Sequence, residues 1–187
     1  MPPTLHEAGA DLERFRAYLS LLGRLGLGPL LRARVDVSGV VQDTLLEAFQ
    51  AGETFFRLSE AQKPLWLRRV LANNLKDTIA ALRTGKRDIR REQALAEALD
   101  ASSARCDGWL ASDDASPSEI AMLHEDQVRL AWALEQLSAE RRTAVELHSL
   151  QGLTLEETAW EMGKTKAAVA QLYSRAVKEL NALLDRA

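Results

Sequence analysis

The stretch Leu153–Leu180, LTLEETAWEMGKTKAAVAQLYSRAVKEL, contains the start and stop signals of two consecutive helices. Thr154 and Glu157 have the spacing of a capping box, in which each side chain accepts a hydrogen bond from the other residue's backbone N–H. Gly163 permits a tight turn, and Thr165 can cap the helix that follows. Two helices separated by so short a turn predict a helix-turn-helix.

The second of these helices has two chemically different sides. Val169, Tyr173, Ala176 and Leu180 share one face at helical spacing, and the small Ala159 suits a close crossing with the first helix. The other side carries bases and amides, as in a recognition helix that reads base edges and binds phosphates. The expected contacts with duplex DNA are Lys164, Thr165, Lys166, Gln171, Ser174, Arg175 and Lys178. The alternative is a helical hairpin whose basic face is only solvated.

A second basic helix is predicted from about residue 60 to residue 82, with Pro64 in its first turn. One of its sides carries Arg68, Arg69, Asn73 and Lys76, and the aromatic residues Phe55, Phe56 and Trp66 gather at its start. Bases, amides and aromatic rings together are typical of surfaces that bind unstacked, single-stranded nucleic acid. The alternative is that the aromatic residues belong to the core.

Charge is distributed along the chain in blocks, although its net value is only −3. The segment Arg57–Arg91 is strongly basic, the segment Glu92–Asp126 is acidic, and the last helix is basic again. Phosphate responds to the local potential within about 8–10 Å, so the net charge does not exclude nucleic acid as a partner. The Ser- and Asp-rich residues 101–118 indicate a boundary between two domains.

Several classes of function are disfavoured by what the sequence lacks. Cys106 is the only cysteine, which suits a reducing cytoplasm. The three histidines are scattered, so we expect no metal and no cofactor. Neither a signal peptide nor a bilayer-spanning run is recognisable, so we expect a cytoplasmic protein. No phosphate loop or nucleophile motif is present, which argues against an enzyme and a small-molecule substrate.

Since no segment requires a β-strand, we predict an all-α fold of two small helical domains, 1–100 and 119–187, joined by an acidic linker, 101–118. The expected helices cover about residues 11–22, 36–50, 60–82, 88–99, 117–137, 139–150, 155–162 and 165–184. Asp36 or Ser38 is expected to cap the second of these, and Ser116 with Glu119 to cap the fifth. Residues 55–58 are expected to form a loop or short turn.

Three motifs in order resemble those of bacterial sigma factors, specifically the compact extracytoplasmic-function (ECF) type with regions two and four. The segment Asp36–Phe49, DVSGVVQDTLLEAF, is similar to the D-x-x-D-x-V-Q-[DE]-[TV]-[FL] motif that docks on the polymerase clamp. Trp66-Leu67, Asn73 and Asp77 match the W-L-x(5)-N-x(3)-D pattern of the helix that engages the melted minus-ten element. The segment Leu137–Leu180 resembles region four, which reads the minus-thirty-five element.

The resemblance implies a promoter-specificity subunit whose partners are core RNA polymerase and promoter DNA, both duplex and single-stranded. It implies that the polymerase clamp is contacted by Asp36, Gln42, Asp43 and Glu47. It implies that the melted minus-ten strand is held by Phe55, Phe56, Lys63, Arg68, Arg69, Asn73 and Lys76. The duplex contacts named above would then meet the minus-thirty-five element. The sequence leaves open whether an anti-sigma factor is a further partner.

Some positions depart from the family pattern. Gly39 stands where the family usually has an acid, Ala80 replaces an expected arginine, and Ala170 and Leu172 replace frequent minus-thirty-five contacts. Trp160 lies off the inner face of its helix; we favour packing against a neighbouring helix over contact with a partner. The competing function is a helix-turn-helix regulator that binds operator DNA without core polymerase, but such a protein has no use for the surface at Trp66–Asp77.

Overall fold

The computed structural model describes residues 5–27, 31, 34–83 and 117–185 of the chain. Every regular element in these ranges is a helix, so the predicted all-α class is confirmed for the described part of the chain. The chain divides into two compact units, Met1–Glu125 and Asp126–Ala187. The predicted helix 88–99 and linker 101–118 fall largely outside the described residues, so the domain limits given above stay a prediction.

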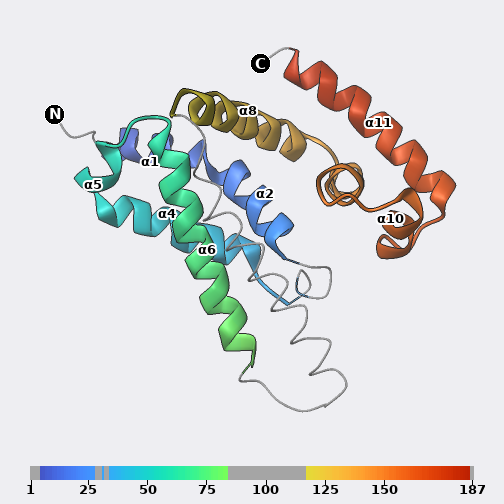
Figure 1. Ribbon diagram of the computed structural model, residues 1–187, viewed down its shortest axis with the longest axis horizontal. Helices are drawn as coiled ribbons and strands as arrows, with labels where there is room; N and C mark the ends of the chain where they lie inside the picture. The colour runs from blue at the N-terminus through green and yellow to red at the C-terminus, as the bar shows by residue number, and fades with distance from the viewer. Residues whose placement is uncertain (1–4, 28–30, 32–33, 84–116, 186–187) are drawn as a thin grey trace. The chain divides into compact units, whose positions relative to one another are not determined.

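The N-terminal unit contains α1 (Leu5–Glu13), α2 (Arg16–Gly26), α4 (Val37–Ala51), α5 (Glu53–Phe56) and α6 (Gln62–Arg83). The long helix α6 crosses α2 and α4, which also contact each other (Figure 1). Fully or almost fully buried side chains along these contacts are Tyr18, Leu19, Val41, Leu45, Leu67, Leu71 and Leu75. The apolar side of α6 thus faces the core, as its sequence period predicts.

Close approach of α2 to the start of α4 depends on Gly23. A Cβ atom added at this position would lie 2.7 Å from Cγ1 of Val37, which is closer than real contacts allow. Gly23 is therefore required for the packing of α2 against α4, because any larger side chain would collide with Val37.

The start and end of α4 differ partly from expectation. Asp36 occupies the N-cap position but its side chain makes no capping hydrogen bond. Its carboxylate lies over Gly39 instead, where an added Cβ would come within 2.9 Å of Oδ2. At the other end Gly52 has a φ of +53°, and the chain enters the four-residue helix α5 at residues expected to form a loop.

The C-terminal unit contains most of α8 (Pro117–Gln136), then α9 (Ala139–Val145), the π-helical segment η1 (Glu146–Leu150), α10 (Leu155–Glu161) and α11 (Lys166–Leu184). Helix α11 packs against α9 and α10. The core of this unit includes Leu134, Leu137, Val145, Val169, Ala176 and Leu180. The predicted start of α8 at Pro117 and the last two helices of the sequence analysis are confirmed.

The segment η1 was expected to continue α9 as an ordinary α-helix. Its turn is wider because the backbone N–H of Gln151 donates to the carbonyl of Glu146, five residues earlier, at 2.9 Å. Gly152 follows with a φ of +74°, and the N–H of Leu153 donates to the carbonyl of Leu147. This wide turn redirects the chain toward α10.

Candidate nucleic-acid interface

The N-terminus of α10 is closed by the predicted capping box. The hydroxyl oxygen of Thr154 accepts a hydrogen bond from the N–H of Glu157 at 3.2 Å, and the Glu157 carboxylate accepts one from the N–H of Thr154 at 2.8 Å. The Thr154 hydroxyl also donates to the same carboxylate. The backbone and hydroxyl hydrogen bonds from Thr154 hold the pKa of Glu157 below its ordinary value.

The turn between α10 and α11 forms as the sequence predicts. Gly163 has a φ of +60°, in the left-handed region that favours glycine. The N–H of Lys164 donates to the carbonyl of Ala159 at 2.9 Å, and the hydroxyl of Thr165 accepts from the N–H of Ala168 at 3.2 Å. Ala159 is buried, so the small side chain permits the close crossing of the two helices.

The exposed side of α11 carries most of the predicted duplex contacts. Thr165, Lys166, Gln171, Ser174, Arg175 and Lys178 are exposed there, opposite the buried Val169, Ala176 and Leu180. Lys164 is half-buried, and its Nζ lies 2.7 Å from the Glu140 carboxylate. The Nζ of Lys166 lies 3.3 Å from Glu156. Since no ion pair involves Arg175 or Lys178 among the described residues, these two cations dominate the potential of the face.

The position of α11 is fixed at mid-length by Tyr173. Its hydroxyl lies 2.9 Å from the hydroxyl of Ser149, and its ring meets the ring of His148 edge to face at 4.7 Å between centroids. Both partners lie in η1, so the wide turn supports the middle of α11. Tyr173 was expected on the inner face of this helix, but its contacts with Ser149 and His148 depend on the π-helical turn, which helical spacing does not predict.

Four predicted strand-binding residues of α6 lie at or near its surface. Arg69 and Asn73 are exposed, and Arg68 and Lys76 are half-buried. Residues 69, 73 and 76 are spaced by four and three positions, so they share one face of the helix. The charge of Arg68 acts on the buried Tyr18: burial raises the pKa of the Tyr18 phenol to about 12, and Arg68 opposes that rise. Arg69 and Asn73 are thus accessible on one side of α6, and the contact of this side with a melted strand stays a prediction.

Phe55 corrects the sequence-based assignment. Its ring is 0% exposed and meets the rings of Phe56 and Trp66 edge to face, with centroids 5.3 and 5.2 Å apart. A buried ring cannot stack on a base, so the core alternative holds for Phe55. Phe56 and Trp66 are half-buried and stay candidates.

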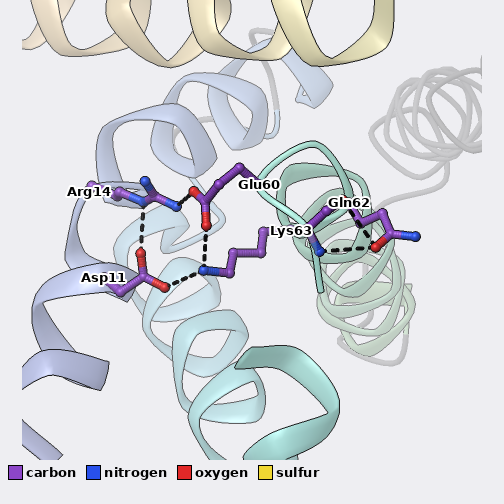
Figure 2. A network of polar contacts seen from close by, with 6 residues as sticks. Asp11, Arg14, Glu60, Gln62 and Lys63 are labelled. Carbon is purple, nitrogen blue, oxygen red and sulfur yellow. Dashed lines mark hydrogen bonds and ion pairs between the residues drawn. The ribbon is translucent and has the colours of Figure 1, made fainter. Parts of the chain in front are cut away.

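Lys63 requires the same correction, because it is only 6% exposed. Figure 2 shows its Nζ between Asp11 Oδ2, at 2.7 Å, and Glu60 Oε1, at 2.8 Å. Arg14 completes the network by pairing with Glu60 and, at 3.1 Å, with Asp11. Burial lowers the pKa of Lys63, but the hydrogen bonds to the two carboxylates outweigh burial and raise it. Lys63 therefore connects α1 to the start of α6, and its ammonium group is not accessible to nucleic acid.

The four residues assigned to the polymerase clamp, Asp36, Gln42, Asp43 and Glu47, are exposed along or just before α4. Gln42 accepts a hydrogen bond from Arg16 at 3.1 Å, and Glu47 accepts one from Asn74 at 2.7 Å. Leu46 and Phe49 are also exposed on α4, although both side chains are apolar. An exposed apolar pair beside acidic and amide groups is the composition of a protein interface.

Neither a metal cluster nor a membrane-spanning helix is found among the described residues. They hold no cluster of three or more His, Cys, Asp or Glu side chains arranged for a metal ion. None of the helices described is both long and apolar enough to cross a membrane.

Comparison with known proteins identifies part of the chain. Residues 127–180 match the family described as Sigma-70, region 4. The chain is also 30% identical, over 119 residues, to the ECF RNA polymerase sigma factor BldN of Streptomyces coelicolor. That match covers 64% of this chain and 40% of the relative's length. No solved structure matches the chain significantly.

Proposed function

Because residues 127–180 form a sigma-70 region 4 domain within a chain distantly homologous to an ECF sigma factor, we propose that this protein is a promoter-specificity subunit of RNA polymerase. The observation that carries the proposal is the presence of two unlike exposed basic helical faces on two separate units. One lies on α6 and the other on α11. A regulator that binds only duplex operator DNA needs the second face and not the first.

The C-terminal unit would bind the minus-thirty-five duplex with α11 in the major groove. Gln171 suits bidentate pairing with adenine, and Lys166 suits guanine or a phosphate. Arg175 and Lys178 suit phosphate contacts that set the register of the helix. Ala170 and Leu172 contribute no charge, and Leu172 is half-buried, so base reading falls mainly on Gln171 and Lys166.

The N-terminal unit would hold the melted minus-ten strand along α6. Arg69 and Lys76 supply cations for the phosphates, and Asn73 supplies an amide that can bond a base edge. The buried residues Phe55 and Lys63 would act indirectly, because they fix the segment between α5 and α6 against the body of the unit. Phe56, the last residue of α5, is half-buried and is the better candidate of the two phenylalanines for stacking on a base.

Helix α4 would dock the protein on core RNA polymerase. Its exposed Asp43, Gln42 and Glu47 provide polar contacts, with Asp36 at the start of the helix, and Leu46 and Phe49 provide apolar area. In this role the chain makes and breaks no covalent bond; it brings polymerase and promoter together and captures unpaired bases. Its place of action is then the cytoplasm, where core polymerase works, and an anti-sigma factor is left open as a further partner.

A binding experiment separates this function from that of an independent regulator. The purified chain is mixed with purified core RNA polymerase and passed through a gel-filtration column, and its binding to promoter DNA is measured with and without core. We expect comigration with core and promoter binding that depends on core. A chain that never comigrates and binds one duplex site tightly by itself is a helix-turn-helix regulator.

A further inference from the structure

Trp160 is the most exposed large hydrophobic residue among those described, with 85% of its surface in contact with solvent. The neighbouring Thr158 and Ala159 are buried against the rest of the unit, so α10 is anchored through its opposite side. Packing on a neighbouring helix, which the sequence analysis favoured, is therefore wrong for Trp160. An indole held in water on a well-anchored helix is unusual, and tryptophan is enriched among residues that dominate binding energy at interfaces.

The indole borders an open depression of about 430 Å³. The residues that line it are Leu153, Glu156, Glu157, Trp160 and Glu161. The surface thus combines one aromatic wall, one aliphatic side chain and three carboxylates. Glu156 and Glu157 precede Trp160 by four and three residues, so they lie on the same side of α10 as the indole, and Glu161 lines the same depression.

The depression is held in shape before any partner arrives. The carboxylate of Glu157 accepts two hydrogen bonds from Thr154, and the backbone N–H of Glu157 donates a third to the Thr154 hydroxyl. The Nζ of Lys166 lies 3.3 Å from Glu156, in an exposed pair that a stronger partner can replace. Because the capping box already orders Glu157, a ligand would lose little affinity in immobilising that carboxylate. Glu161 is exposed and makes no ion pair with a described residue, which leaves its charge available.

We propose that this face of α10 docks an arginine-bearing segment of a partner protein. A guanidinium group can stack flat on the Trp160 indole and at the same time pair with Glu161 or Glu156. An aliphatic side chain of the same segment would lie against Leu153. Arginine fits better than lysine because its planar group both stacks and forms forked hydrogen bonds.

Charge excludes the main competing occupants. Three carboxylates repel nucleic acid, and the strongest cations of this unit, Arg175 and Lys178, lie on α11 and not on this surface. Acidic peptides are disfavoured for the same reason. The docking face meets the proposed duplex-binding face at Lys166, whose Nζ lies 3.3 Å from Glu156. The docking proposal does not rest on the promoter function, so either can fail without the other.

A peptide selection tests both the site and the chemistry of its occupant. A random 12-residue peptide library displayed on phage is panned against the full chain, with removal of clones that also bind the Trp160→Ala variant. We expect the surviving peptides to contain arginine together with an aliphatic residue more often than the starting library. Survivors without an excess of arginine, or no survivors that depend on Trp160, would overturn the proposal.

The affinity of a selected peptide is then measured by fluorescence anisotropy for the wild-type chain and three variants. Trp160→Ala should weaken binding by at least about tenfold, as expected for a central tryptophan, and Glu156→Gln with Glu161→Gln by about threefold to tenfold. Trp132→Ala, which changes another exposed tryptophan of the same unit, should leave the affinity unchanged. Equal weakening by Trp132→Ala, competition by duplex DNA, or self-association of the chain through Trp160 would each contradict the assignment. Circular dichroism checks that every variant is folded.

Discussion

The Nζ atom of Lys63 lies 2.7 Å from Oδ2 of Asp11, although the two residues are 52 positions apart in the chain. Glu60 and Arg14 close the rest of the network, so four charged side chains connect α1 to the start of α6. This connection holds in place residues 57–61, the segment that joins α6 to α5, whose last residue is Phe56. The network stabilises the unit without offering its central cation to a ligand.

Lys63→Met should lower the free energy of unfolding of the N-terminal unit by about 1–2 kcal/mol. Removing the ammonium leaves Asp11 and Glu60 with Arg14 as their remaining partner. Because Glu60 is also largely exposed, the loss lies at the low end of the range for such changes. Arg57→Met is the matched control, since it breaks the exposed pair with Glu53 and should cost less than about 0.5 kcal/mol. Urea unfolding, followed through the amide signals of α6, measures the loss of stability in both variants. Equal losses would show that the network does not stabilise the unit.

Asn73 and Asn74 are adjacent but should give opposite phenotypes. Asn74 donates hydrogen bonds to Thr44 at 3.2 Å and to Glu47 at 2.7 Å, so Asn74→Ala should cost about 1 kcal/mol of stability. Asn73 is exposed, so Asn73→Ala should leave stability unchanged but slow promoter opening. Permanganate footprinting with core polymerase measures opening. An opening rate for Asn73→Ala equal to wild type would refute its contact with the melted strand.

Arg175→Ala and Lys178→Ala should each weaken binding to minus-thirty-five duplex DNA and reduce the slope of log affinity against log salt by about one. The reason is that each phosphate contact releases condensed counterions. Arg129→Ala is the control: it removes one positive charge whose guanidinium donates to the Leu184 carbonyl, at the far end of α11. If the salt slope is the same in all three variants and in wild type, neither Arg175 nor Lys178 contacts a phosphate.

Asp43→Arg should abolish comigration with core RNA polymerase while leaving the helical circular-dichroism signal intact. Asp43 is exposed on α4, so the substitution reverses a charge without disturbing packing. Asp185→Arg makes the same change of charge at the end of α11 and should assemble normally. Normal assembly of the Asp43 variant would remove this residue from the interface.

The capping box should respond to pH. The pKa of Glu157 is lowered in the folded state, so its contribution is present above the ordinary value of 4.5 and is lost as pH falls through the lowered folded value. Thr154→Ala should therefore destabilise α10 by about 1 kcal/mol at pH 7, and its effect should shrink below pH 4.5. Thr165→Ala removes a cap that involves no carboxylate, so its effect should not change with pH. Parallel pH profiles of the two variants, from urea melts of the C-terminal unit, would rule out a role for the Glu157 charge.

Local signals in the sequence were sufficient for the helix-turn-helix. The helix caps and the turn are made by residues close together in sequence: Thr154, Glu157, Gly163 and Thr165. Their spacing therefore predicts the caps and the turn without knowledge of the tertiary packing. The π-helical turn at Glu146–Leu150 was missed because a single wider turn leaves almost no trace in hydrophobic periodicity.

Exposure was predicted less well than secondary structure. Phe55 and Lys63 were assigned to a nucleic-acid surface because their residue types suit one, yet both are buried. Lys63 pairs with Asp11, which is distant in sequence, and Phe55 packs against Trp66 of α6. The opposite error concerns Trp160, which was expected to pack against a neighbouring helix but is exposed. Which side of a helix meets the rest of a unit depends on the packing of other helices, which a single sequence period does not specify.

The most direct test uses in vitro transcription with purified core RNA polymerase on a template library in which two upstream elements are randomised. If α6 engages opened strand and α11 engages duplex, transcripts should start at a discrete position, and the productive templates should share two sequence elements at a fixed spacing. Transcription no greater than with core alone, or productive templates that share only one element, would contradict the division of work between the two units.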